Sequence, residues 1–320
     1  MWFRRIFRLG NFLTKSELRS EDQNDQLVPR LAPEALRQLN RLQIRGSKAL
    51  RGDGFGIRSS NRGKPAMEFR EHRMYVPGDD IRFVDWKASA RNEKIFVRQG
   101  EMPKDVLVYL LLDCSASMLW GHRSKRETQL ALASALGYTA LKDGDRLYVS
   151  PYGDMANIEF GPVIGKGYLS SYIRYLNQLN YGGQSNLENA VRTIKQKFSR
   201  GGVVFIMSDL LEKGDLSAIL SHLPAPKWWV NVLHLLHPGE LNPEIRGFYE
   251  LEDRETGQLR NYDLTKEAMN KYRERVKSWR SQLELHAVDH HAFYFLIKTD
   301  WSLSREVIPY LREHQVLVSE

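Results

Sequence analysis

The stretch VLVYLLLDCSASM at residues 106–118 joins an uncharged apolar run to one acid and two hydroxyl side chains. A continuous apolar run without polar alternation is typical of a strand that is buried on both faces of a parallel sheet. Asp113 ends the run, and Ser115 and Ser117 follow it at alternate positions. While the chain stays extended, alternate side chains point to the same side. The stretch therefore predicts a buried strand that ends in a group of side-chain oxygens.

Apolar runs and amphipathic segments alternate through the rest of the chain. Strands are predicted at residues 106–113, 145–153, 201–209 and 228–237, and helices at residues 125–144, 186–198, 213–223, 265–286 and 301–320. A hairpin is predicted at residues 248–264, before the long helix. Strands that alternate with helices in this way form a parallel sheet that is covered on both faces. The predicted fold class is therefore α/β, with a doubly wound, mostly parallel, Rossmann-type sheet.

The first third of the chain is basic and irregular. Residues 1–105 contain 22 Lys and Arg against 14 Asp and Glu, which accounts for the whole net charge of +8. Residues 32–50 have leucines at helical spacing and predict an N-terminal helix. Residues 51–102 combine glycines with short extended runs and predict a smaller β-rich element. We therefore divide the chain into residues 1–104, which hold this helix and the basic β-rich segment, and residues 105–320, the α/β domain.

Composition places the chain among soluble globular proteins. Hydrophobic residues make up 42% and charged residues 27% of the sequence, and no apolar run reaches the length of about 18 residues that a membrane span needs. The single cysteine, Cys114, fits a reducing compartment, so we expect a cytoplasmic protein. The basic, amphipathic residues 1–15 would either dock on the protein itself or make weak peripheral contact with the inner membrane. No zinc-finger, RNP or helix-turn-helix pattern occurs, so we expect no specific nucleic-acid partner.

Two further polar positions follow the predicted strands. Ser185 lies in the glycine-opened loop YGGQSNL, and Asp209 comes directly after the strand VVFIM. In open α/β sheets ligands bind in the crevice at the carboxyl ends of the strands, where these side chains would meet. The predicted metal ligands are Asp113, Ser115, Ser117, Ser185 and Asp209. Carboxylates and hydroxyls are hard oxygen donors, which suit Mg²⁺, or else Mn²⁺ or Ca²⁺. The alternative is that the two early serines cap the next helix while Asp113 hydrogen-bonds the loop.

These motifs resemble a known family. The stretch FREHRMYVPGDDIRFVDWKASARNEKIFVRQGE, residues 69–101, is similar to the segment that precedes the von Willebrand factor A-type (vWA) domain in bacterial DUF58 proteins. The A-domain signature, D-x-S-x-S followed by a hydroxyl in a Gly-rich loop and an Asp after a strand, matches the five predicted ligands. In that family they form a metal-ion-dependent adhesion site (MIDAS), usually with Mg²⁺. Ser185 stands where A domains more often have Thr, which keeps the hydroxyl.

The resemblance implies a non-enzymatic adaptor or co-chaperone that binds a protein partner. The implied partner is a MoxR-type AAA+ ATPase in complex assembly or maturation, which would supply a carboxylate as the last ligand of the metal. The alternative is a Mg²⁺-dependent phosphate-ester hydrolase that uses Asp113. Phosphatases of the haloacid dehalogenase class carry a second Asp two residues later, and here that position is Ser115. Because the resemblance implies a binding protein and the second Asp of the phosphatases is missing, we expect no enzymatic activity. Cys114 is expected to be a core residue.

Overall fold

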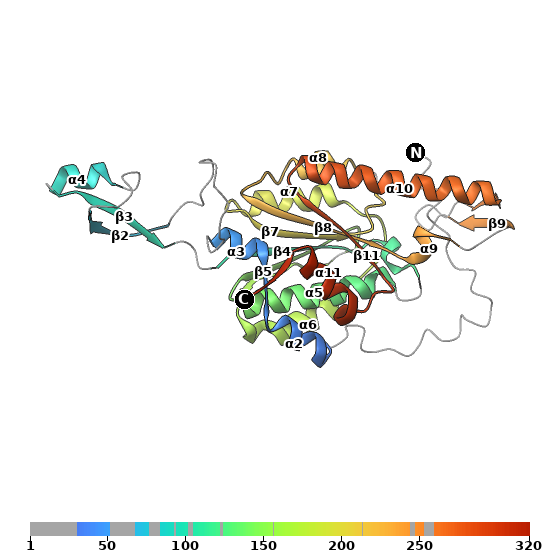
Figure 1. The fold of residues 1–320 in the computed structure, drawn as a ribbon, viewed down its shortest axis with the longest axis horizontal. Coiled ribbons are helices and arrows are strands. Elements are labelled where there is room, and N and C mark those ends of the chain that lie inside the picture. Colours follow the sequence, from blue (N-terminus) through green and yellow to red (C-terminus); the bar gives the residue numbers. More distant parts are fainter. Residues whose placement is uncertain are drawn as a thin grey trace.

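Figure 1 shows the computed structural model of the chain. The structure describes residues 31–51, 68–76, 84–92, 94–101, 105–121, 124–155, 157–212, 214–243, 247–252 and 259–320. The membrane contact predicted for residues 1–15 lies outside these ranges. None of the helices within them has the length and apolarity of a transmembrane segment.

A six-stranded sheet forms the centre of the structure (Figure 1). In chain order its strands are β4 (Leu107–Asp113), β5 (Arg146–Tyr152), β6 (Phe160–Ile164), β7 (Gly202–Ser208), β8 (Trp228–Leu236) and β11 (Phe293–Lys298). Their order across the sheet is β11-β8-β7-β4-β5-β6, and every neighbouring pair is parallel except β5 with β6. The predicted α/β fold with a doubly wound, mostly parallel sheet is confirmed. The two edge strands, β6 and β11, were not predicted.

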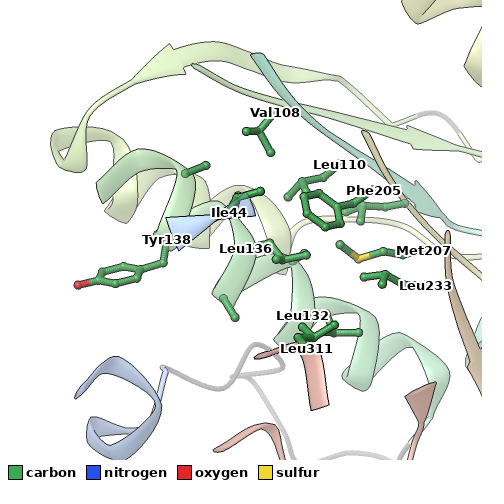
Figure 2. Close-up of a cluster of buried hydrophobic side chains, with 14 of the residues drawn as sticks. Ile44, Val108, Leu110, Leu132, Leu136, Tyr138, Phe205, Met207, Leu233 and Leu311 are labelled. Atoms are coloured by element: carbon green, nitrogen blue, oxygen red, sulfur yellow. The ribbon is translucent and has the colours of Figure 1, made fainter. Parts of the chain in front are cut away.

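Helices cover both faces of the sheet (Figure 1). One face carries α2 (Pro33–Leu39), α5 (Lys125–Lys142), α6 (Leu169–Asn177) and α11 (Ile308–Glu313), and the other carries α7 (Leu187–Lys197), α8 (Leu216–Leu220) and α10 (Lys266–Asp289). In β4, Leu110 and Leu112 pack into the first layer, which Figure 2 shows, whereas Tyr109 and Leu111 pack into the second. All four are fully buried. The strand is uninterruptedly apolar because neither of its faces meets water.

The predicted N-terminal helix at residues 32–50 is broken in the structure, so that expectation was wrong. It consists of α2, the strand β1 (Leu42–Ile44) and α3 (Arg45–Arg51). The strand pairs antiparallel with β12 (Leu317–Ser319). Lys142 at the end of α5 donates to the carbonyl of Leu42 at 2.9 Å, so tertiary contacts override the helical spacing of the leucines.

The smaller β-rich element is an antiparallel pair, β2 (Glu68–Met74) with β3 (Phe96–Glu101), joined to α4 (Trp86–Asn92). In Figure 1 it lies to one side of the α/β domain. The predicted hairpin is present as β9 (Gly247–Glu252) and β10 (Leu259–Leu264). The last predicted helix, at residues 301–320, is shorter than expected: a π-helix (Leu303–Val307) leads into α11, and β12 follows. The division of the chain at residues 104 and 105 stays a prediction.

Candidate metal site

Asp113 is the last residue of β4, and its carboxylate is enclosed by hydrogen-bond donors. Oδ1 accepts from the backbone N–H of Ser115 at 2.9 Å. Oδ2 accepts from the hydroxyl of Ser208 at 2.6 Å and from that of Ser185 at 3.1 Å. The Asp113 side chain is fully buried, so the carboxylate is fixed by three elements of the fold. These contacts join the end of β4 to the end of β7 and to the loop before α7.

The remaining predicted ligands join the same cluster. The hydroxyls of Ser115 and Ser117 lie 3.0 Å apart, around the start of a 3₁₀ turn (Ala116–Leu119). Asp209, the residue that follows β7, lies near enough to Ser117 for the Ser117 hydroxyl to help lower the pKa of Asp209. Ser115 and Asp209 are buried, whereas Ser117 and Ser185 are partly exposed. All five predicted residues therefore come together, and Ser117 and Ser185 form the partly exposed side of the cluster.

Glycines let the loop that carries Ser185 approach the end of β4. The N–H of Gly182 donates to the carbonyl of Cys114 at 2.8 Å, and the carbonyl of Gly183 accepts from Ala116 at 3.0 Å. Gly183 has φ +65°, and a Cβ there would come within 2.5 Å of the Cβ of Asp154. A side chain at this position would be strained and would push the loop away from the cluster.

A buried ammonium completes the cluster. Nζ of Lys125, the first residue of α5, lies 2.7 Å from Oδ2 of Asp209 and 2.7 Å from Oε1 of Glu240 in α9 (Pro238–Leu241). The Lys125 side chain is 1% exposed and both acids are 2% exposed. Burial would lower the pKa of Lys125, but the charges of Asp209 and Glu240 outweigh burial and raise it, so a positive charge lies beside the candidate site.

The two predicted acids have opposite pKa shifts. Burial, together with the negative charge of Asp209, raises the pKa of Asp113 to about 7. Burial would also raise the pKa of Asp209, but the charge and hydrogen bond of Lys125 outweigh it and hold that pKa below its ordinary value. Asp113 thus has no positive charge paired with it among the described residues of the cluster, and a bound cation would supply that positive charge.

Two side chains outside the predicted ligand set hydrogen-bond backbone carbonyls of the strand ends that carry the cluster. Gln129 in α5 donates to the carbonyls of Asp113 at 3.0 Å and Met207 at 2.9 Å, which bridges the ends of β4 and β7. Nε2 of His234 lies 2.9 Å from the carbonyl of Asp209 and must donate to it, because a carbonyl only accepts. Burial lowers the pKa of His234 to about 3, so this imidazole is neutral and serves the scaffold.

The donor set suits a hard divalent cation. It offers two carboxylates and three hydroxyls, and no thiolate or imidazole faces it among the contacts of the described residues. Within the ranges that the structure describes, no three side chains of His, Cys, Asp or Glu are grouped to hold a metal. A cation here would depend on the hydroxyls and on water for its remaining ligands, which is how Mg²⁺ is commonly bound.

Sequence reasoning missed three residues of this cluster. Ser208 is visible in the sequence only as the residue before Asp209, at the last position of the strand. Lys125 and Glu240 have no local signal, because they meet only when the start of α5 and α9 come together. The binding of a metal ion by the five predicted ligands stays a prediction.

Comparison with known proteins identifies relatives of this chain. Uncharacterized proteins of Mycobacterium bovis (Mb1516) and Mycobacterium tuberculosis (Rv1480) are each 27% identical over 220 residues, which cover 67% of this chain and 68% of theirs. Similar solved structures include BatB from Bacteroides thetaiotaomicron (16% identity, TM-score 0.39, 66% of this chain and 98% of that one) and the SpRpn10 VWA domain (10% identity, TM-score 0.37, 64% and 94%). With TM-scores below 0.5, these structural likenesses do not establish a shared function.

The family model described as "Protein of unknown function DUF58" matches residues 71–282. The match includes part of the stretch at residues 69–101 and all five predicted ligands. It covers well over half of the 320 residues. The chain therefore belongs to the DUF58 family.

Proposed function

We propose that this protein is a non-enzymatic adaptor that binds a protein partner through a divalent cation held at the end of its central sheet. The observation that supports this most strongly is the convergence of two carboxylates and three hydroxyls from three separate segments on one partly open cluster. The buried Asp113 carboxylate, with a pKa raised to about 7 by burial and by the charge of Asp209, favours a cation beside it.

The residues that would hold the cation are Asp113, Ser115, Ser117, Ser185 and Asp209. A bound Mg²⁺ would offer an open coordination position to a carboxylate from another protein. The chain's own part is to fix the donors: Ser208 and Gln129 hold the carboxyl and carbonyl of Asp113, and Lys125 holds Asp209. Fixed donors make binding depend on the charge and size of the ion and on one carboxylate of the partner.

The border of the site is suited to contact with a protein. Leu119, 38% exposed, ends the 3₁₀ turn that begins beside Ser115. Met155, 41% exposed, lies next to Gly182 of the facing loop. Apolar side chains around a polar centre are typical of an interface in which a partner excludes water from the central contact. From the family resemblance, the partner would be a MoxR-type AAA+ ATPase, and we place the complex in the cytoplasm.

Calorimetric titration of Mg²⁺ into metal-free protein tests the cation site. Wild type is expected to bind one Mg²⁺ saturably, and Asp113→Asn is expected to lose this binding while keeping the shape of the side chain. The matched control is Asp145→Asn: Asp145 is also fully buried and accepts from the N–H of Val106 at the opposite end of β4. The control should bind as wild type does. Wild type that takes up no Mg²⁺, Mn²⁺ or Ca²⁺ would contradict the proposal.

A second experiment tests the partner. A candidate MoxR-type ATPase is passed over immobilised wild-type protein in Mg²⁺ and in chelator, and over Asp113→Asn in Mg²⁺. Retention is expected only on wild type with Mg²⁺. Equal retention in all three conditions would show that docking does not use the cation. Release of phosphate from a generic aryl phosphate by wild type, lost in Asp113→Asn, would favour the hydrolase instead.

A further inference from the structure

Lys125 is shared between one predicted cation ligand and one residue outside the ligand set. Its ammonium lies 2.7 Å from Oδ2 of Asp209 and 2.7 Å from Oε1 of Glu240. All three side chains are almost completely buried, so their charges act on each other with little screening by water or salt. The strength of the Lys125 contact with Asp209 therefore depends on Glu240.

Glu240 is held in place by contacts that do not involve Lys125. Its Oε2 accepts the N–H of His237 at 2.8 Å in a capping box at the start of α9. Its carbonyl accepts from the hydroxyl of Tyr272 in α10 at 2.6 Å. The carboxylate is thus positioned by α9 and α10 to meet the ammonium, and α9 follows directly on β8 (Figure 1).

The charges of the cluster add up to the charge of one divalent ion. When Asp113 is ionised, above its pKa of about 7 or beside a bound cation, three carboxylates (Asp113, Asp209 and Glu240) and the one ammonium of Lys125 leave two negative charges in a buried space. Without the Glu240 carboxylate, Lys125 would be balanced by Asp209 alone and only one negative charge would remain. A buried site that is not neutralised by its ion binds that ion less well.

We propose that Glu240 is a positioning residue for the cation site, which takes up the charge of Lys125 so that Asp209 keeps its own charge for a divalent ion. This assignment rests on the proposed cation binding. Glu240, in α9, lies outside the predicted ligand set and meets Asp209 through the shared ammonium of Lys125. The affinity for a divalent ion is expected to depend on the summed charge of Lys125 and Glu240, and not on the presence of either side chain.

The test is a cycle of Mg²⁺ titrations by calorimetry at one pH and one ionic strength. The proteins are wild type, Glu240→Gln, and the double variant Lys125→Met/Glu240→Gln. Glu240→Gln keeps an acceptor for the cap but removes the charge, and Mg²⁺ affinity is expected to fall about tenfold or more. The double variant removes both charges, restores two net negative charges and is expected to bind Mg²⁺ within about threefold of wild type.

The control is Glu306→Gln. Glu306 also accepts a backbone N–H, that of Ser302 at 2.7 Å, but it lies in the π-helix (Leu303–Val307), whereas Lys125 pairs with Asp209 and Glu240. It should leave Mg²⁺ affinity unchanged. Circular dichroism and thermal unfolding in chelator show that each variant is folded before it is titrated.

The outcomes separate this assignment from the proposed function. Wild type that binds Mg²⁺ beside a Glu240→Gln variant that binds equally well would overturn the assignment alone. A double variant that binds as weakly as Glu240→Gln would also overturn it, because a purely structural role of Glu240 is not rescued by the loss of Lys125. No Mg²⁺ binding by wild type would overturn both the proposed function and the assignment.

Discussion

The hydroxyl of Ser208 donates a 2.6 Å hydrogen bond to Oδ2 of Asp113, and the two residues end neighbouring parallel strands of the central sheet. The serine lies immediately before Asp209, so β7 contributes to the site through two consecutive residues. One supports the acid of the neighbouring strand, and the next is itself a predicted ligand. The carboxyl end of β7 therefore determines the geometry of both acids.

Replacement of Ser208 by Ala should weaken the fold more than an ordinary loss of a hydroxyl. The bond to a buried carboxylate contributes about 1.5–3 kcal/mol to the free energy of unfolding. Ser134→Ala is the control, because the hydroxyl of Ser134 is also buried but bonds only the carbonyl of Leu130 in its own helix. Urea unfolding in chelator at pH 8 measures both. Equal losses for the two variants would contradict the role given to Ser208.

Metal-free protein should lose stability as the pH rises because of Asp113. Burial and the charge of Asp209 raise the pKa of Asp113 in the folded state to about 7, whereas the unfolded value is near 3.8. Between these values the folded state holds a proton that the unfolded state has released. The contribution of Asp113 is therefore fully present below about pH 4 and declines by up to about 4 kcal/mol as the pH passes 7.

The contribution of Asp113 to the pH dependence of stability is isolated by comparing wild type with Asp113→Asn. The free energy of unfolding of wild type minus that of Asp113→Asn is measured in chelator from pH 5 to pH 8, since both proteins share every other titrating group. The difference is expected to fall with pH. A difference that is flat or that rises across this range would show that the Asp113 carboxyl is ionised throughout.

Lys125→Met should cost about 3–5 kcal/mol of stability, because it leaves Asp209 and Glu240 buried without their shared counter-ion. Arg192→Met is the control for an exposed ion pair, because Arg192 pairs with Glu188 and the two side chains are 56% and 48% exposed. Its loss should be much smaller. Thermal or urea unfolding in chelator compares the two, and similar losses would contradict the buried charge cluster.

Gly137→Ala should destabilise the protein although alanine is the better helix former. A Cβ at Gly137 in α5 would lie 2.4 Å from the ring of Tyr172, and the hydroxyl of that Tyr is fixed by the carbonyl of Ala133 at 2.6 Å. Overpacking of this kind costs about 1–3 kcal/mol. Gly167→Ala, with nothing within 4 Å of the added Cβ, should leave the unfolding midpoint nearly unchanged. A stabilised Gly137→Ala would show that Tyr172 can move.

Cys114 should react with thiol reagents only when the protein unfolds. It is fully buried, and burial, with the charge of Asp113, raises the pKa of its thiol to about 12. At pH 8 the folded protein should therefore show almost no labelling by a chromogenic disulfide reagent, and urea should release one thiol per chain. Rapid labelling of the folded protein would place the thiol at the surface. Such a result would contradict the packing at the end of β4.

The strands in the middle of the sheet could be predicted because they are buried on both faces and their sequences are therefore apolar at nearly every position. In β7 all seven positions are buried, and the sequence is correspondingly apolar from Val203 to Met207. The edge strands β6 and β11 are not buried at every position. The residues of β6 are half-buried or exposed, so its sequence has no pattern that distinguishes it from a loop. In β11 the buried Phe295 and Ile297 alternate with half-buried neighbours, and the apolar run at residues 293–297 is a strand signal that the sequence reasoning overlooked.

The same contrast holds for the candidate site. Asp113, Ser115 and Ser117 could be predicted together because they follow one another closely at the end of one apolar strand, although a 3₁₀ turn (Ala116–Leu119), and not an extended chain, brings Ser117 beside Ser115. Lys125 and Glu240 are 115 positions apart, and no spacing rule connects them. Their contact follows from where α9 packs, which depends on α10 and on the end of β8. Long-range placement of single charges is what one sequence cannot provide.

The position of β4 in the sheet has a consequence for synthesis. The strand that carries Asp113 pairs with β7, whose partner residues lie about a hundred positions later in the chain. A nascent chain thus exposes Asp113 long before Ser208 and Asp209 have been made. The cluster therefore forms only after the middle of the sheet has closed, so its geometry marks a chain whose central sheet is complete.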